Sequence, residues 1–122
     1  MLMSGAELVA LHKGRYWQTE DGLQLDIGAF VVGLEHATGK TAAVMGKPSE
    51  NFFQLPIEDM GLEPSRVMMI GDDINSDIGG AMAIGCKGGL VRTGKYRDEL
   101  AARSEVTPTI TLDSINDLRD RL

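Results

Sequence analysis

Apolar residues recur at helical spacing in two long stretches of the chain. Between residues 27 and 38 they return every three or four positions, which predicts an amphipathic helix that ends at Gly39. A second helix is predicted over residues 49–60, with a kink or break at Pro56 because proline has no backbone N–H to donate inside a helix. Two shorter helices are predicted over residues 97–103 and 114–121.

Short apolar runs between these helices predict strands. The clearest is Val-Met-Met-Ile at residues 67–70, because it is uninterrupted and Gly71 ends it. Strands and helices alternate along the chain, so we expect an α/β fold with a right-handed parallel sheet. The other predicted strands are residues 7–12, 41–45, 88–91 and 109–111, together with a short extended piece after Gly14 that ends at the turn over residues 20–22.

Composition and charge narrow the range of partners. The 122 residues are 43% hydrophobic and 25% charged, as in an ordinary soluble domain. The net charge of −6 argues against nucleic acid and anionic membranes, and no apolar run approaches the length of a membrane span. The single cysteine, Cys86, excludes an internal disulfide and indicates a reducing compartment, the cytoplasm. It is interpreted as a small buried residue rather than a nucleophile.

Three carboxylates crowd the end of the strand at residues 67–70. Asp72, Asp73 and Asp77 follow it directly, and ligands of open parallel sheets bind at the carboxyl ends of strands. Like charges at this separation call for a cation, and Mg²⁺ fits because it takes a few carboxylate oxygens and keeps several waters. An alternative is that Asp73 or Asn75 caps the following helix while Asp77 lies in solvent.

Lys47 stands just before the helix at residues 49–60, one strand ahead of the acids. A lysine at the same strand-end crevice would balance the carboxylates and hold a phosphoryl oxygen, whereas alone it would be an ordinary solvated side chain. The segment from Gly33 to Thr41 is similar to a phosphate-binding P-loop motif, but its two glycines are separated by five residues, whereas the motif requires four. We therefore exclude a P-loop. His12 is interpreted as a strand residue, not a ligand.

These motifs resemble those of the haloacid dehalogenase-like (HAD) phosphohydrolases. The acid motif is Gly-Asp-Asp-Ile-Asn-Ser-Asp at residues 71–77, the lysine motif is Gly-Lys-Pro-Ser at residues 46–49, and their order is that of the family. Residues 8–40 are similar to the end of the large α/β cap of class IIA members, and residues 93–96 to the loop after the next core strand. The chain looks most like the hydrolase-domain-containing group related to phosphohistidine and pyrophosphate phosphatases.

The resemblance implies a partial Rossmann-like parallel sheet of the HAD type and a remnant of an α/β cap. Residues 1–40 would be the C-terminal remnant of the cap, and residues 41–122 the C-terminal part of the core. It also implies Mg²⁺ as cofactor and a phosphorylated small molecule or phospho-residue as substrate. The implied site consists of Asp72, Asp73 and Asp77 as metal ligands, Lys47 and Asp77 as catalytic residues, and Lys47 with Ser49 as substrate-binding residues.

The nucleophile of this family is the first Asp of a D-x-D pair, and these 122 residues contain no D-x-D. We therefore expect a phosphatase half that is inactive alone. Its bare strand at residues 67–70 would pair in a homo-oligomer or with the missing half. The alternative is a non-catalytic module that binds a metal, a phosphate or a partner. A response-regulator receiver is excluded because its lysine follows its acids, whereas Lys47 precedes them.

Overall fold

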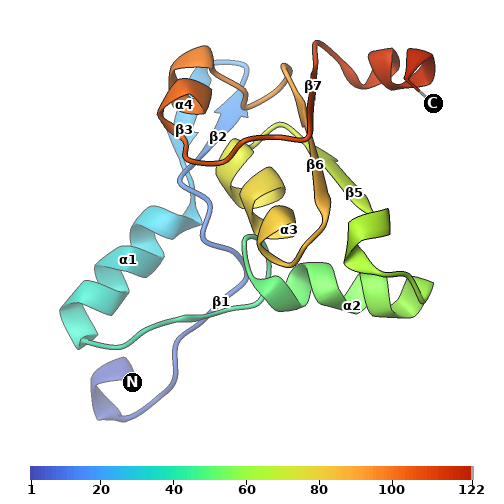
Figure 1. Ribbon diagram of the computed structural model, residues 1–122. Helices are drawn as coiled ribbons and strands as arrows, with labels where there is room; N and C mark the ends of the chain where they lie inside the picture. Colours follow the sequence, from blue (N-terminus) through green and yellow to red (C-terminus); the bar gives the residue numbers. More distant parts are fainter. Residues whose placement is uncertain (122) are drawn as a thin grey trace.

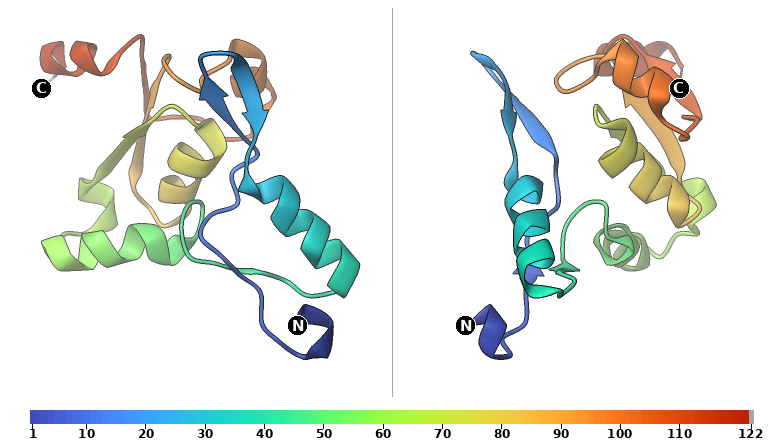
Figure 2. Two further views of the ribbon diagram at one scale, coloured as in Figure 1. Left: turned by 180° about the vertical axis from the view of Figure 1, so that it is seen from behind. Right: turned by 90° about the vertical axis from the view of Figure 1, so that its left-hand side faces the viewer.

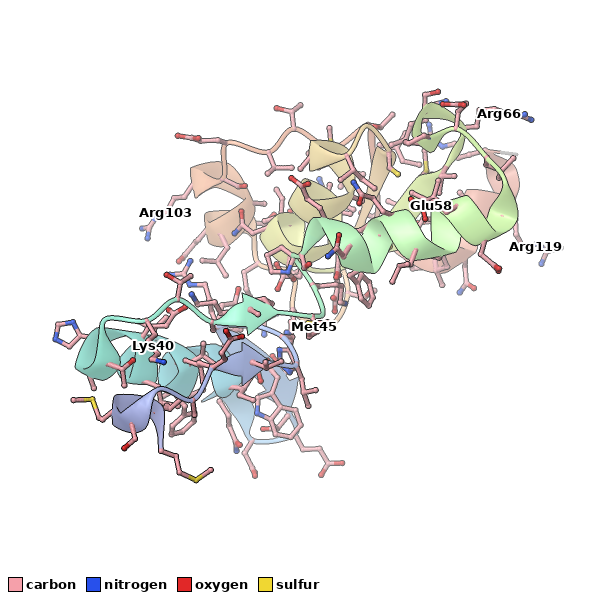
Figure 3. All side chains as sticks on the ribbon, turned by 90° about the horizontal axis from the view of Figure 1, so that it is seen from below. Lys40, Met45, Glu58, Arg66, Arg103 and Arg119 are labelled. Carbon is pink, nitrogen blue, oxygen red and sulfur yellow. The ribbon has the colours of Figure 1, made fainter. Side chains whose placement is uncertain are left out.

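The computed structural model describes residues 1–121 and shows two bodies, joined at Met45 (Figures 1 and 3). The N-terminal body, residues 1–45, contains η1 (Leu2–Ser4), β1 (Val9–Ala10), β2 (Tyr16–Thr19), β3 (Gly22–Leu25), α1 (Ile27–Thr38) and β4 (Ala43–Val44). The C-terminal body, residues 46–121, contains α2 (Glu50–Met60), η2 (Pro64–Arg66), β5 (Met68–Gly71), η3 (Ile74–Gly79), α3 (Gly80–Ala83), β6 (Lys87–Val91), α4 (Asp98–Arg103), β7 (Ile110–Leu112) and η4 (Ile115–Asp120). None of the helices in residues 1–121 is long and apolar enough to cross a bilayer.

A three-stranded parallel sheet organises the C-terminal body. Its order is β5-β6-β7, so β5 forms one edge of the sheet among the described residues. Ile78 of η3 is fully buried against Leu90 of β6, and α2 packs its Phe53 against Ala81 of α3. Figure 1 shows α2 and α3 side by side. The predicted α/β class with parallel strands is confirmed. Cys86 is buried as predicted, and burial raises the pKa of its thiol.

The N-terminal body is built around α1. The helix begins after Asp26, whose carboxylate accepts the N–H of Ile27 at 2.7 Å, and it ends where Gly39 adopts a left-handed conformation. Its buried Val31 packs on Ala10 and Ala42. The predicted bounds of this helix, residues 27–38, are confirmed.

The parallel strands do not form one sheet, which corrects the sequence-based expectation. β4 pairs with β1 instead of joining β5, and the ladder continues beyond it because Met45 N–H donates to Ala10 O and Gly46 N–H to Leu11 O. These hydrogen bonds make β4 part of the N-terminal body. The prediction also missed β3, which forms an antiparallel hairpin with β2.

Two helix predictions need correction, and the helix that follows the acids has an unusual start. Helix α2 runs through Pro56 without a break, because the proline lies on the exposed face, where water can solvate the carbonyl that loses its donor. The helix after the acids begins as a π-helix, in which Ile78 N–H reaches back five residues to Asp73 O. The last helix, η4, is a 3₁₀-helix, held at its start by a capping box between Ser114 and Asp117.

Glu35 ties the N-terminal body together. Its carboxylate accepts a hydrogen bond from Lys13 Nζ at 2.7 Å and another from Ala42 N–H at 2.9 Å, so it joins α1 to the segments on either side. Both bonds favour the ionised form. The bond from Lys13 is the larger cause that lowers the pKa of Glu35 below its ordinary value of 4.5, and the bond from Ala42 adds to it.

We expect Glu35→Gln to lower the free energy of unfolding at neutral pH, and this loss to shrink in acid. A carboxyl whose pKa is lowered by folding stabilises the protein above its unfolded-state pKa, and that stability disappears as the pH falls through the folded value. Urea unfolding between pH 7 and pH 3 measures the difference, with exposed Glu58→Gln as control. A difference that stays constant over this range would contradict the account.

Candidate functional site

A cavity of about 420 Å³ is lined by residues of both bodies at the carboxyl end of β5. The C-terminal body contributes most of the charged side chains, and the N-terminal body adds the loop before β2 and the start of α1. The charged residues of the lining are Asp26, Asp72, Asp73, Asp77, Lys47 and Lys95, and the others are Leu11, His12, Gly14, Gly46, Phe52 and Ser76.

The shortest ion pair of the cavity joins Lys47 to Asp77. Lys47 Nζ lies 2.6 Å from Asp77 Oδ1, and the aspartate side chain is only 5% exposed. The other oxygen, Oδ2, accepts the N–H of Asp73 at 3.2 Å. Gly71 makes this placement possible, because a Cβ there would overlap the Asp77 carboxylate. Asp77 is therefore held against the end of β5 with Lys47 directly on it.

Asp72 is fixed by the loop that follows β6. Its Oδ2 accepts the N–H of Lys95 at 2.8 Å, and a Cβ at Gly94 would overlap the same oxygen. The residues of the described chain offer no hydrogen bond to Asp72 Oδ1. One oxygen of this half-buried carboxylate is thus held by the protein while the other remains available at the cavity.

Asp73 caps the helix that starts at Ile74. Its Oδ1 accepts the backbone N–H groups of Asn75 and Ser76 at 3.1 and 3.0 Å, so the capping alternative is confirmed for this residue. The second part of that alternative is wrong, because Asp77 is buried rather than solvated. Burial, with the charge of Asp73 as the second cause, raises the pKa of nearby Tyr16, so its phenol stays protonated.

The donor set of the cavity fits a divalent cation. Four carboxylates line it against two lysines, which leaves two negative charges unbalanced. No three His, Cys, Asp or Glu side chains within residues 1–121 are grouped closely enough to enclose a metal by themselves. That arrangement suits Mg²⁺, which is commonly held by one or two carboxylates and keeps several waters.

The structure brings most of the predicted site residues together. Lys47, Asp72, Asp73 and Asp77 all line the cavity, whereas Ser49 lies at the cap of α2 and is not part of the lining. Their predicted roles as ligands and catalytic groups stay predictions.

Lys95 and Asp26 were missed as lining residues by the sequence-based reasoning, and the interpretation of His12 as a strand residue is wrong, because β1 ends at Ala10 and His12 lies in the following loop. Lys95 Nζ lies 3.9 Å from Asp26 Oδ2 and 4.0 Å from Asp73 Oδ2, so it bridges the two bodies. Lys95 follows a parallel strand, a position that could have signalled a site. His12 and Asp26 carry no such signal, because their segments meet the C-terminal body only after folding.

Comparisons with known proteins agree with the fold and the motifs. The model of the HAD-hydrolase-like family matches residues 44–118. The phospholysine phosphohistidine inorganic pyrophosphate phosphatase of Xenopus laevis is 52% identical over 100 residues, which cover 82% of this chain and 37% of that protein.

Solved phosphatase structures share the arrangement of the elements. The p-nitrophenyl phosphatase from Archaeoglobus fulgidus matches with a TM-score of 0.85 at 29% identity, covering 98% of this chain and 48% of that one. The glycerol phosphate phosphatase from Mycobacterium tuberculosis, solved in complex with magnesium, matches with a TM-score of 0.73 at 30% identity, covering 90% and 33%.

The chain therefore spans less than half the length of these relatives. The resemblance predicted from the acid and lysine motifs is confirmed by a family match that includes both motifs and by a relative of the expected phosphohistidine and pyrophosphate phosphatase group. With its acids at the end of a parallel strand and Lys47 paired to the last of them, the chain belongs to the HAD-like hydrolase family.

Proposed function

We propose that the cavity is the metal- and phosphate-binding part of a phosphatase active site. The observation that carries this proposal is the 2.6 Å pair between Lys47 Nζ and the buried Asp77, beside Asp72 at the carboxyl end of β5. Family membership supports a phosphatase. The substrate would be a phosphorylated small molecule or a phospho-residue, and the single buried cysteine favours the cytoplasm.

Lys47 would bind and orient the phosphoryl group. An ammonium group has three N–H donors, and the bond to Asp77 uses one, which leaves two for phosphate oxygens. Asp77 would act through this lysine, because its carboxylate holds the ammonium group in place. A positive charge positioned before the reaction stabilises the charge that develops during phosphoryl transfer. Ser49, at the start of α2, remains a candidate for a weaker contact with the substrate.

Asp72 would provide the main protein ligand for Mg²⁺, through its free Oδ1. Asp77 would support the site from behind, because Lys47 Nζ and the N–H of Asp73 engage both of its oxygens, and Asp73 would support it through Oδ2, because two backbone N–H groups occupy its Oδ1. A bound Mg²⁺ neutralises phosphoryl oxygens and so favours attack on phosphorus. The unbalanced negative charge of the cavity and the magnesium complex of a structural relative support this assignment.

The attacking carboxylate would come from a segment outside these 122 residues. The family resemblance assigns it to a D-x-D pair on a strand beside β5, and β5 is the sheet edge among the described residues. Next to that edge lies an apolar groove of about 480 Å³, lined by residues such as Leu55, Met60 and Met68. We propose that the nucleophile-bearing segment covers it. In this proposal residues 1–40 are the cap remnant, although β4 beyond them also pairs with β1.

We expect Asp72→Asn to abolish Mg²⁺ binding that is weak in the unaltered chain. The amide removes the negative charge at Asp72, whose Oδ1 accepts no hydrogen bond from the described residues, while its oxygen can still accept the N–H of Lys95. Calorimetric titration with MgCl₂ measures the effect, and Asp98→Asn, outside the cavity, is the matched control. Unchanged Mg²⁺ affinity in Asp72→Asn would remove this residue from the metal site.

We expect the 122-residue chain by itself to hydrolyse phosphomonoesters only at trace rates. Without an attacking carboxylate no phosphoenzyme forms, and positioning alone leaves a small residual effect. A p-nitrophenyl phosphate assay with Mg²⁺ tests this. Sustained turnover that copurifies with the chain and disappears in Lys47→Ala would show that the nucleophile lies within these residues. Binding of phosphate without turnover would fit both the isolated half-site and the alternative, a non-catalytic module.

We expect the isolated chain to form dimers or larger assemblies through the uncovered edge of β5. Unpaired strand backbone next to apolar side chains is a template for pairing. Light scattering measures the mass, and Leu55→Glu, in the groove and 66% exposed, should shift the chain toward monomers. Leu34→Glu on α1, outside the groove, should not. If the unsubstituted chain is a folded monomer in dilute solution, the edge of β5 is not a pairing surface.

A further inference from the structure

The loop between β6 and α4 contacts both bodies. The right-hand view of Figure 2 shows it extending from the C-terminal body toward the hairpin of β2 and β3. In this loop, Arg97 donates a hydrogen bond to the side chain of Gln18 in β2, and Lys95 Nζ lies 3.9 Å from Asp26 Oδ2. The backbone N–H of Lys95 also holds Asp72. One loop therefore connects the proposed metal site to the N-terminal body.

The ammonium group of Lys95 lies between two carboxylates that have the same local role. Asp26 caps α1 in the N-terminal body, and Asp73 caps η3 in the C-terminal body, each through its Oδ1. The second oxygen, Oδ2, lies 3.9 Å from Lys95 Nζ in Asp26 and 4.0 Å from it in Asp73. Neither distance is short enough for a hydrogen bond, so the two caps share one positive charge.

The backbone of Lys95 is fixed, whereas its side chain is free to move between the two caps. Its N–H donates to Asp72 Oδ2 at 2.8 Å, and the left-handed Gly94 before it leaves room for that carboxylate, which a Cβ would overlap. The described residues give Lys95 Nζ two ion pairs but no hydrogen bond. With its side chain 25% exposed, the charge is only partly screened by water, so both carboxylates attract it.

We propose that Lys95 is a positioning residue that couples occupancy of the metal site to the contact between the two bodies. This inference rests on the proposed function, in which Asp73 supports Mg²⁺ through Oδ2. When a cation neutralises Asp73, Lys95 is attracted to Asp26 alone and moves toward it, which tightens the contact between the bodies. Conversely, Asp26 draws Lys95 away from Asp73 and leaves Oδ2 to the cation. Linkage requires the two effects to be equal in free energy.

A double-mutant cycle on Mg²⁺ affinity tests this coupling. Calorimetry compares the unaltered chain, Asp26→Asn, Lys95→Met and the double variant. Asparagine can still cap α1, and methionine retains the backbone N–H that holds Asp72. Lys95→Met alone should strengthen Mg²⁺ binding. Asp26→Asn should weaken it about two- to fivefold more in the unaltered background than in the Lys95→Met background, as one partly exposed ion pair provides. Equal effects of Asp26→Asn in the two backgrounds would overturn the inference.

Two further lysine variants show whether the charge at this position is responsible. Lys95→Arg retains the positive charge and should preserve the coupling to Asp26. Lys87→Met removes an exposed lysine of β6 that lies outside the cavity, and the effect of Asp26→Asn in this background should equal that in the unaltered chain. Loss of the coupling in Lys95→Arg, or an equal loss in Lys87→Met, would overturn the inference.

The carboxyl carbon of Asp26 gives a spectroscopic signature that a purely structural role of Lys95 would not produce. Its NMR signal is identified by its absence in Asp26→Asn. In the unaltered chain this signal should shift as MgCl₂ is added, with the midpoint found by calorimetry, because Lys95 approaches Asp26. In Lys95→Met most of the shift should disappear. An equal shift in Lys95→Met, or none in the unaltered chain, would contradict the coupling.

Asp72→Asn distinguishes failure of this inference from failure of the proposed function. If this variant abolishes Mg²⁺ binding while the cycle between Asp26 and Lys95 is additive, only the role of Lys95 is wrong. If Asp72→Asn leaves Mg²⁺ affinity unchanged, or if the unaltered chain binds no Mg²⁺, the proposed function is wrong, and the coupling through Lys95 is overturned with it.

Discussion

The ion pair between Lys47 and Asp77 is the interaction on which the site depends. The lysine comes from the connection between β4 and α2, and the aspartate from η3, so the pair joins the link between the bodies to the end of the parallel sheet. Because the Asp77 side chain is almost fully buried, its charge would be costly without a partner. The same burial explains why Gly71 ends β5: the carboxylate occupies the space of its side chain.

The two bodies have different tasks around this pair. The C-terminal body places its charged groups by short backbone hydrogen bonds, as when Lys95 N–H holds one oxygen of Asp72. The N-terminal body adds His12, on the loop after β1, and Asp26, at the start of α1.

Local patterns in the sequence predicted the elements whose causes are local. Helix α1 has its cap at Asp26 and its stop at Gly39, and its bounds were found to the residue. The acid motif and Lys47 were found because both lie at strand ends. The separate β1-β4 ladder, by contrast, depends on hydrogen bonds from Met45 and Gly46 to residues more than thirty positions away, which no local pattern records. His12 was wrongly interpreted as a strand residue for the same reason, since only folding brings its loop to the cavity.

The central claim is that one cavity, built by both bodies, binds phosphate together with Mg²⁺. Mapping amide chemical shifts by NMR, as inorganic phosphate is added with and without MgCl₂, tests it most directly. We predict saturable changes in the amide chemical shifts of residues 46–47, 71–77 and 94–95. The affinity for phosphate obtained from these changes should be higher when Mg²⁺ is present. Shifts confined to the separate pocket that Arg92 and Arg121 line, or none at the cavity, would contradict it.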